Sequence, residues 1–138
     1  MDYGLSPEEM RVFLEEAEEQ LSLLEEDLLS LEKIDNDTEY QRLLQEIFRA
    51  AHTLKGSAAA IGHQKMASLT HAMETLLDKV RHRELDISSS LVNAFLEGLD
   101  YLARWKDEIS TSEDSNLDAS TLVEKLKSFK PKAPPLFR

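Results

Sequence analysis

The chain has 138 residues, of which 41% are hydrophobic, and this length and composition favour one compact domain with short tails. It contains no cysteine, which excludes disulfides and thiolate metal sites, and its formal net charge of −11 disfavours nucleic-acid binding. No apolar run approaches the roughly 20 residues of a membrane span, and the N-terminus lacks a basic stretch followed by an apolar one. We therefore expect a monomeric cytoplasmic domain without membrane insertion.

The first helix is predicted to begin at Ser6, because Ser6 is a good N-cap, Pro7 suits the first helical position and Glu9 closes a capping box. Apolar residues then recur three or four positions apart, as in the helices of a bundle. This stripe consists of Met10, Phe13, Ala17, Leu21, Leu24, Leu28 and Leu31. Residues 6–33 also contain ten acidic and two basic side chains, which we interpret as a solvated face.

Two further helices are predicted to form a hairpin. Capping and turn residues at 34–38 precede a helix from about Glu39 to Ile61, which Gly62 ends. The third helix follows almost at once, and so short a connection favours an antiparallel pair. Its apolar stripe consists of Met66, Leu69, Met73, Leu76 and Val80.

A fourth and a short fifth helix complete the pattern. Ser88 is predicted to cap the fourth helix, which ends near Ile109 and buries Leu91 or Val92, Phe95, Leu99 and Leu102. After a polar loop at 110–116, Asp118 is predicted to cap the fifth helix. The inward-facing residues of that helix are Leu122, Val123, Leu126 and Phe129.

These elements predict an all-α fold, an antiparallel up-and-down four-helix bundle with a short fifth C-terminal helix. The low content of glycine and proline, four of each, agrees with it. The bundle is expected to occupy residues 1–130. Residues 131–138 are rich in proline and are expected to start a linker or tail, so the chain is interpreted as one module of a longer protein.

One segment of the second helix, residues 50–62, is not explained by packing alone. At about 100° per residue, His52 lies roughly 120° from the middle of that helix's apolar stripe, on its solvent-exposed shoulder. Lys55 and Gly56 share the same shoulder, one turn further on. A glycine within a helix costs about 1 kcal/mol relative to alanine. We infer that the small residue serves the close approach of a partner to His52.

The predicted hairpin brings polar residues of the third helix to the same height. Counted from Gly62 at about 1.5 Å per residue, His71 and Glu74 fall within about one and a half turns of His52 and Lys55. The Glu74 carboxylate is then expected to accept a hydrogen bond from Nδ1–H of His52, which leaves Nε2 as the nucleophile. Lys55 would partly neutralise an anionic group arriving at Nε2.

The segment HTLKG at 52–56 resembles the phosphorylated-histidine motif H-x-L-K-G of histidine phosphotransfer (HPt) domains. The runs AAHTLKGSAAAIG, LTHAMETLLDKVR and FLEGLDYL follow in the order found in the subfamily at the N-terminus of CheA-type chemotaxis histidine kinases. This resemblance implies that His52 is phosphorylated and that Gly56 permits close approach. It also implies that Lys55, His71 and Glu74 form the hydrogen-bonding and charge network of that histidine.

The resemblance further implies a phosphorelay carrier in two-component, chemotaxis-type signalling. An ATP-dependent histidine kinase domain would phosphorylate His52, and an aspartate of a response-regulator receiver domain would take the phosphoryl group. We expect no cofactor in this domain, with ATP and magnesium bound by the partner kinase domain. No glycine-rich nucleotide loop is present, so the domain is interpreted as the substrate and carrier, and its parent chain as the histidine protein kinase.

The remaining basic residues have simpler interpretations. His63, at the hairpin turn, and His82 are expected to be surface residues. The group Lys79, Arg81, His82 and Arg83 places favourable cations at the end of the third helix. Residues 46–85 nevertheless carry a net charge of +2, which favours the approach of an acidic partner.

Two other functions compete with this interpretation. A di-metal carboxylate bundle needs Glu-x-x-His pairs on two helices, whereas His71 and Glu74 occur in the reverse order and without a second pair. A helical adaptor or protein-interaction module without catalytic function is compatible with the apolar stripes. His52, Lys55 and Gly56 on one shoulder argue against the adaptor.

Overall fold

The structure is a computed structural model that describes residues 3–130, and the predicted linker at 131–138 lies outside the described residues. The described part contains five helices and no strand, which confirms the all-α prediction. The helices are α1 (Pro7–Leu31), α2 (Asp37–Ile61), α3 (Gln64–Arg81), α4 (Ser89–Thr111) and α5 (Ser120–Lys127).

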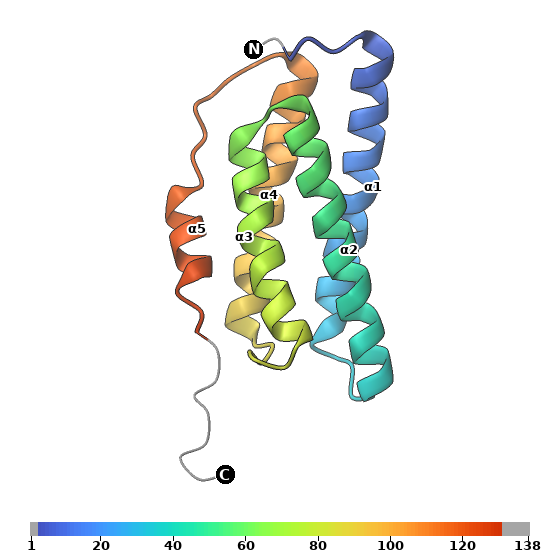
Figure 1. The fold of residues 1–138 in the computed structure, drawn as a ribbon, viewed down its shortest axis with the longest axis vertical. Helices are drawn as coiled ribbons and strands as arrows, with labels where there is room; N and C mark the ends of the chain where they lie inside the picture. The colour runs from blue at the N-terminus through green and yellow to red at the C-terminus, as the bar shows by residue number, and fades with distance from the viewer. Residues whose placement is uncertain (1–2, 131–138) are drawn as a thin grey trace.

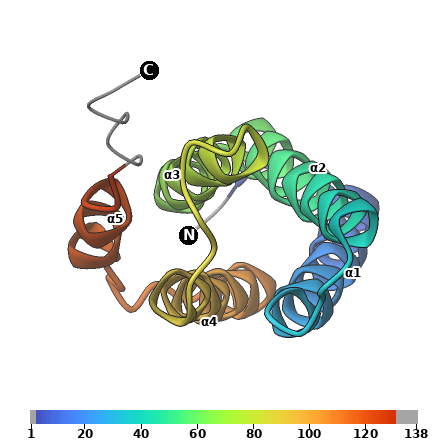
Figure 2. The ribbon, with the colours of Figure 1, turned by 90° about the horizontal axis from the view of Figure 1, so that it is seen from below.

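The first four helices form an antiparallel bundle in which α1 packs against α2 and α4, and α3 packs against the same two helices (Figure 1). Seen along the bundle, the short helix α5 lies outside this ring, against α3 and α4 (Figure 2). The face of α2 that points away from the bundle is therefore left open by α5.

The predicted caps set most of the helix ends. Ser6 Oγ accepts a hydrogen bond from the backbone N–H of Glu9 at 3.1 Å, and the Glu9 carboxylate accepts one from the backbone N–H of Ser6 at 2.9 Å. Helix α2 begins two residues earlier than predicted, because Asn36 rather than a later residue accepts from the N–H of Glu39 at 3.0 Å. Gly62 ends this helix with φ of 81°, in the left-handed conformation that glycine adopts without strain.

The last two helices differ slightly from the prediction. Ser88 caps α4 as expected, and α4 continues two residues past Ile109 to Thr111. The N-cap position of α5 is Ala119, which has no side chain to accept a hydrogen bond. Asp118 still accepts from the N–H of Ser120 at 3.0 Å, so its carboxylate supports the first turn from one position before the cap.

The core is built largely from the predicted stripes. Leu69 of α3 and Leu91 and Phe95 of α4 are at most 1% exposed, and Ile47 and Leu54 on the inward face of α2 are equally buried. Leu122 and Leu126 anchor α5 on this core, while Val123 and Phe129 are only partly buried. None of the helices within residues 3–130 combines the length and the apolarity that crossing a bilayer requires.

Candidate functional site

His52 lies on the outward shoulder of α2, where the apolar stripe predicted it. Its side chain is 63% exposed, whereas Ala51 and Leu54, one and two residues away on the inward side of the helix, are buried. The backbone at His52 belongs to the uninterrupted helix, so the imidazole projects from a rigid element.

Glu74 of α3 joins His52 and Lys55 of α2 in one network. His52 Nδ1 lies 3.0 Å from Glu74 Oε1, and Lys55 Nζ lies 2.8 Å from Glu74 Oε2. The Glu74 side chain is only 14% exposed, so each of its two oxygens faces one partner while little of the carboxylate faces water. The predicted contact across the hairpin is present.

The protonation of Glu74 decides what this network does. Burial alone raises the pKa of Glu74, but the Lys55 ammonium and then the His52 ring outweigh it, so that the pKa lies below its ordinary value of 4.5. The carboxylate is therefore ionised at neutral pH and acts only as an acceptor. A neutral His52 then carries its proton on Nδ1, and the lone pair of Nε2 is left free.

His71 does not join this network. Among the described residues, no hydrogen bond or ion pair links it to His52, Lys55 or Glu74. It lines a groove of about 310 Å³ between α3 and α5, together with Thr75 and Lys79. Because His71 and Glu74 are three residues apart on α3, both were expected to face His52. In the structure Glu74 is turned toward α2 and His71 toward α5.

Gly56 is exposed one turn beyond His52. A Cβ atom added there would meet nothing within 4 Å. Gly98 of α4 is the contrasting case, because a Cβ there would lie 3.0 Å from Met73 Sδ. Packing inside the domain thus accounts for the glycine at 98 but does not by itself require one at 56.

The interpretation of His63 as a plain surface residue is wrong. It is half-buried, and its Nδ1 accepts a hydrogen bond from the N–H of Met66, which makes it the N-cap of α3. Its ring contacts those of Tyr3 and Trp105, with centroids 5.9 and 5.5 Å away, and burial lowers its pKa. Sequence reasoning missed this role because the two partner rings lie far from His63 in the sequence, one before α1 and the other in α4.

His82 is exposed, as expected, and its Nδ1 lies 2.8 Å from the carbonyl oxygen of Asp78. Arg81, which the sequence suggested only as a cation at a helix end, instead reaches across to α2. Its guanidinium carbon lies 4.0 Å from the centre of the Phe48 ring, which in turn lies beside His52. Phe48 and Arg81 thus adjoin the site, and the sequence analysis did not single them out for it.

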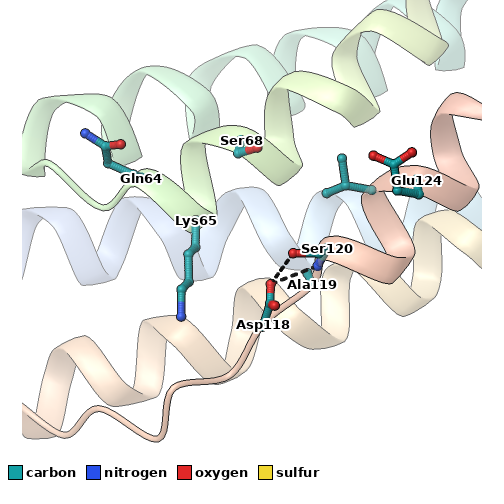
Figure 3. A pocket seen from close by; sticks show the side chains of 8 residues that line it. Gln64, Lys65, Ser68, Asp118, Ala119, Ser120 and Glu124 are labelled. Carbon is teal, nitrogen blue, oxygen red and sulfur yellow. Dashed lines mark hydrogen bonds between the residues drawn. The ribbon is translucent and has the colours of Figure 1, made fainter.

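A separate hollow of about 320 Å³ lies between the starts of α3 and α5 (Figure 3). Lys65 and Ser68 face Asp118 and Ser120 there, and the drawn hydrogen bonds join only the last two residues. None of the predicted site residues lines it. Within residues 3–130, no group of three or more His, Asp or Glu side chains is placed to hold a metal ion.

Comparison with known proteins agrees with this site. The family model described as "Hpt domain" matches residues 8–111. CheA of Bacillus subtilis, a chemotaxis protein, is 38% identical over 115 residues, which are 83% of this chain and 17% of that protein. The chain therefore spans about a sixth of the length of this relative.

Two solved structures share the fold. The solution structure of the histidine phosphotransfer domain of CheA is 34% identical, with a TM-score of 0.80, over 97% of this chain and all of that one. The phosphorylated P1 domain of CheA3 in complex with CheY6, from R. sphaeroides, has a TM-score of 0.74 over 88% of this chain and 94% of that one. It is 23% identical and shows the likeness of fold alone. From the family match and the relatives together, the chain belongs to the Hpt domain family of histidine phosphotransfer domains.

Proposed function

We propose that this domain carries a phosphoryl group on Nε2 of His52 in a chemotaxis-type two-component phosphorelay. The observation that supports it most is the contact of Nδ1 with the ionised Glu74 carboxylate, on a side chain that is 63% exposed. This contact holds Nδ1 of the ring, while Nε2 is left for an incoming group.

Both steps of the transfer can be written with His52 and Glu74 as the groups of this chain that take part. The lone pair of Nε2 forms a bond to the γ-phosphorus of ATP while the bond from that phosphorus to the bridging oxygen of ADP breaks. The positive charge that develops on the ring is stabilised by Glu74 through the Nδ1–H. In the second step a carboxylate oxygen of the receiver attacks the phosphorus, and the N–P electron pair returns to Nε2.

Lys55 and Gly56 have distinct parts in this proposal. Lys55 sits one turn from His52 and is held by Glu74, so its ammonium adds positive charge where the phosphoryl oxygens arrive. Gly56 clears the surface on the same shoulder for the incoming domain. In-line phosphoryl transfer depends mainly on access and charge placement, and these two residues supply both.

We infer two partners of different kinds. The donor is an ATP-binding histidine kinase domain, which would hold the ATP and magnesium. The acceptor is a receiver domain with an aspartate, by analogy with the CheA3 P1 domain of similar fold that binds CheY6. The net charge of +2 over residues 46–85, in a chain of −11, favours the approach of an acidic receiver surface to the hairpin.

A histidine replacement series tests the assignment. Incubated with a CheA kinase domain and labelled ATP, His52→Gln is expected to keep its helix content and accept no label, whereas His71→Gln and His82→Gln accept it. The bond formed should be labile to acid, as expected for a phosphohistidine. Label on the His52→Gln protein would overturn the assignment, and no label on any variant, the unaltered chain included, would favour the helical adaptor.

A further inference from the structure

Phe48 lies on α2 one turn before His52, and the two rings are nearly parallel. Their planes differ by 10° and their centroids are 6.4 Å apart, within the range in which aromatic rings form offset stacks. Phe48 is half-buried, in contrast to the exposed His52. Residues four apart lie on the same side of a helix, so the phenyl ring stands next to the face of the imidazole.

The phenyl ring is itself held from the other helix of the hairpin. The Arg81 guanidinium carbon lies 4.0 Å from the Phe48 centroid, in cation–π geometry. Its Nη1 donates to Gln45 Oε1 at 2.9 Å, and its Nη2 donates to Asp78 Oδ1 at 2.8 Å. These two hydrogen bonds fix the orientation of the planar guanidinium, which stacks on the face of the phenyl ring.

Core packing restrains Phe48 only in part, because its ring is partly buried against the hydrophobic core. A hollow of about 340 Å³ adjoins Phe48, lined on the α3 side by residues that include Glu74 and Asp78. A phenyl ring beside open space is free to change its rotamer unless something covers its face. In this hairpin the covering group is Arg81.

The contact matters because one hydrogen bond does not orient a ring. The bond from Nδ1 to Glu74 holds one point of the imidazole and selects its tautomer, but leaves the ring free to swing about the N···O direction. At 63% exposure, His52 receives little restraint from the core. We propose that Phe48, held by Arg81, is a positioning residue that restricts this swing and aims Nε2 for in-line attack.

The proposal rests on His52 being the phosphorylated residue, and it separates two roles at the site. Glu74 determines which nitrogen carries the proton, whereas Phe48 determines the direction in which the other nitrogen points. Loss of orientation slows the chemical step, by about tenfold to a hundredfold for misplacement on the 1 Å scale, and leaves docking of the donor unchanged. It should therefore lower kcat for phosphorylation and leave KM near its original value.

The test compares Phe48→Leu, which keeps apolar bulk and loses the flat ring, with Phe48→Tyr, which keeps the ring. With a CheA kinase domain and ATP, Phe48→Leu is expected to lower kcat about tenfold or more, and Phe48→Tyr to restore it. Arg81→Met should lower kcat in the same direction. Tyr101→Leu is the matched control. Tyr101 is a half-buried aromatic of α4 whose ring contacts Trp105, with centroids 5.8 Å apart, and within the described residues it makes no ring contact with His52.

NMR of the His52 ring supplies a readout that does not depend on transfer. In Phe48→Leu, the ring-nitrogen shifts should still report the Nδ1–H tautomer, while side-chain couplings should report averaging over rotamers that Phe48→Tyr does not show. Equal kcat in Phe48→Leu and the unaltered domain, or unchanged rotamer averaging, would overturn the proposal. If the rotamers change as expected but no variant accepts phosphoryl, the orientation stands and the proposed function fails.

Discussion

At the scale of single residues, Glu74 is the residue that joins His52 and Lys55 into one network. One carboxylate contacts both Lys55, at 2.8 Å, and His52, at 3.0 Å, and it is 14% exposed. Its low pKa results from competition between burial and these two partners. Removing a partner should therefore change the titration of Glu74 before it changes the fold.

Replacing Lys55 with methionine tests this dependence. The variant keeps most of the side-chain length and removes the group that lowers the pKa of Glu74 most, so that burial is less opposed. The pKa of Glu74 should rise relative to the unaltered domain. NMR titration of the Glu74 carboxyl carbon measures this pKa. Lys65→Met is the control, because within residues 3–130 Lys65 donates to the Leu117 carbonyl and makes no ion pair with Glu74. An unchanged pKa would contradict the ion pair.

Glu74→Gln should affect rate more than stability. Glutamine keeps the size of the side chain but loses the charge that offsets the imidazolium character of the attacking ring. Phosphorylation should slow by roughly one to a few powers of ten, the scale for a group that assists proton placement and charge stabilisation. Quench-flow with labelled ATP measures the rate, and NMR of the ring nitrogens measures the tautomer. A wild-type rate together with a wild-type tautomer ratio would show that the contact has no part in the chemistry.

At the scale of a helix, the glycines inside α2 and α4 differ in their surroundings, because a Cβ at Gly56 would meet nothing and one at Gly98 would meet Met73. Both carry the same propensity cost. Gly56→Ala should stabilise the domain by up to about 1 kcal/mol, because the added methyl meets nothing. Gly98→Ala should gain less or lose stability, since its methyl must displace Met73 Sδ from 3.0 Å. Urea denaturation compares them, and an equal gain at both positions would refute the contrast.

A bulkier substitution at Gly56 should affect the rate of phosphoryl transfer and the stability of the domain in opposite directions. Gly56→Leu is expected to fold at least as stably as the unaltered domain, because leucine is a better helix former than glycine. Transfer to and from His52 should slow as the side chain blocks approach. Leucine at Ala103, a half-buried position on α4, is a control for added bulk at a distance. Undiminished transfer by Gly56→Leu would show that partners arrive from another side.

The helices and the His52–Glu74 contact could be predicted from the sequence because both follow from local rules. Caps such as Ser6 and Ser88 identify helix starts, and the three-to-four spacing identifies the buried face. The turn at Gly62 sets the height of residues along the hairpin. Counting outward from it was sufficient to pair two residues 22 positions apart.

The features that could not be predicted depend on how each helix is rotated about its axis and on contacts between segments far apart in the sequence. Axial height alone did not distinguish Glu74, turned toward α2, from His71, turned toward the groove beside α5. The Arg81 contact with Phe48 spans two helices and depends on the direction of a long side chain. The aromatic contacts of His63 require knowing that Tyr3 and Trp105 converge on one end of the bundle.

At the scale of the whole molecule, one buried acid links stability to pH. Asp27 of α1 is 7% exposed. Its pKa is raised from 3.8 to about 6, first by burial and then by the neighbouring carboxyl of Glu46 on α2. Below about pH 4 the folded and unfolded chains both hold this proton. Between about pH 4 and 6 only the folded chain does, so the contribution of Asp27 to stability falls as pH rises through this window and is constant above it.

Asp27→Asn should remove that dependence. At about pH 7.5 the variant should be more stable than the unaltered domain by about 1–3 kcal/mol, because the buried charge is absent, and near pH 4 the two should be alike. Glu25→Gln, at an exposed position two residues away that does not contribute to the raised pKa of Asp27, is the control and should show no such difference between the two pH values. Urea denaturation at both pH values is the measurement. An equal stability difference at the two would mean that Asp27 does not titrate between them.

The outward placement of His52 on a continuous helix has a consequence for the order of events. Because a single imidazole is exposed on one shoulder of α2, the donor and acceptor domains share one binding site and must occupy it in turn. The relay should then follow ping-pong kinetics, in which the first product leaves before the second substrate binds. A receiver that lacks its acceptor aspartate should act as a competitive inhibitor of phosphorylation, and steady-state rates at varied receiver concentration would measure it. With a single binding place, the time that each domain stays bound at His52 should limit the rate at which the other domain can react.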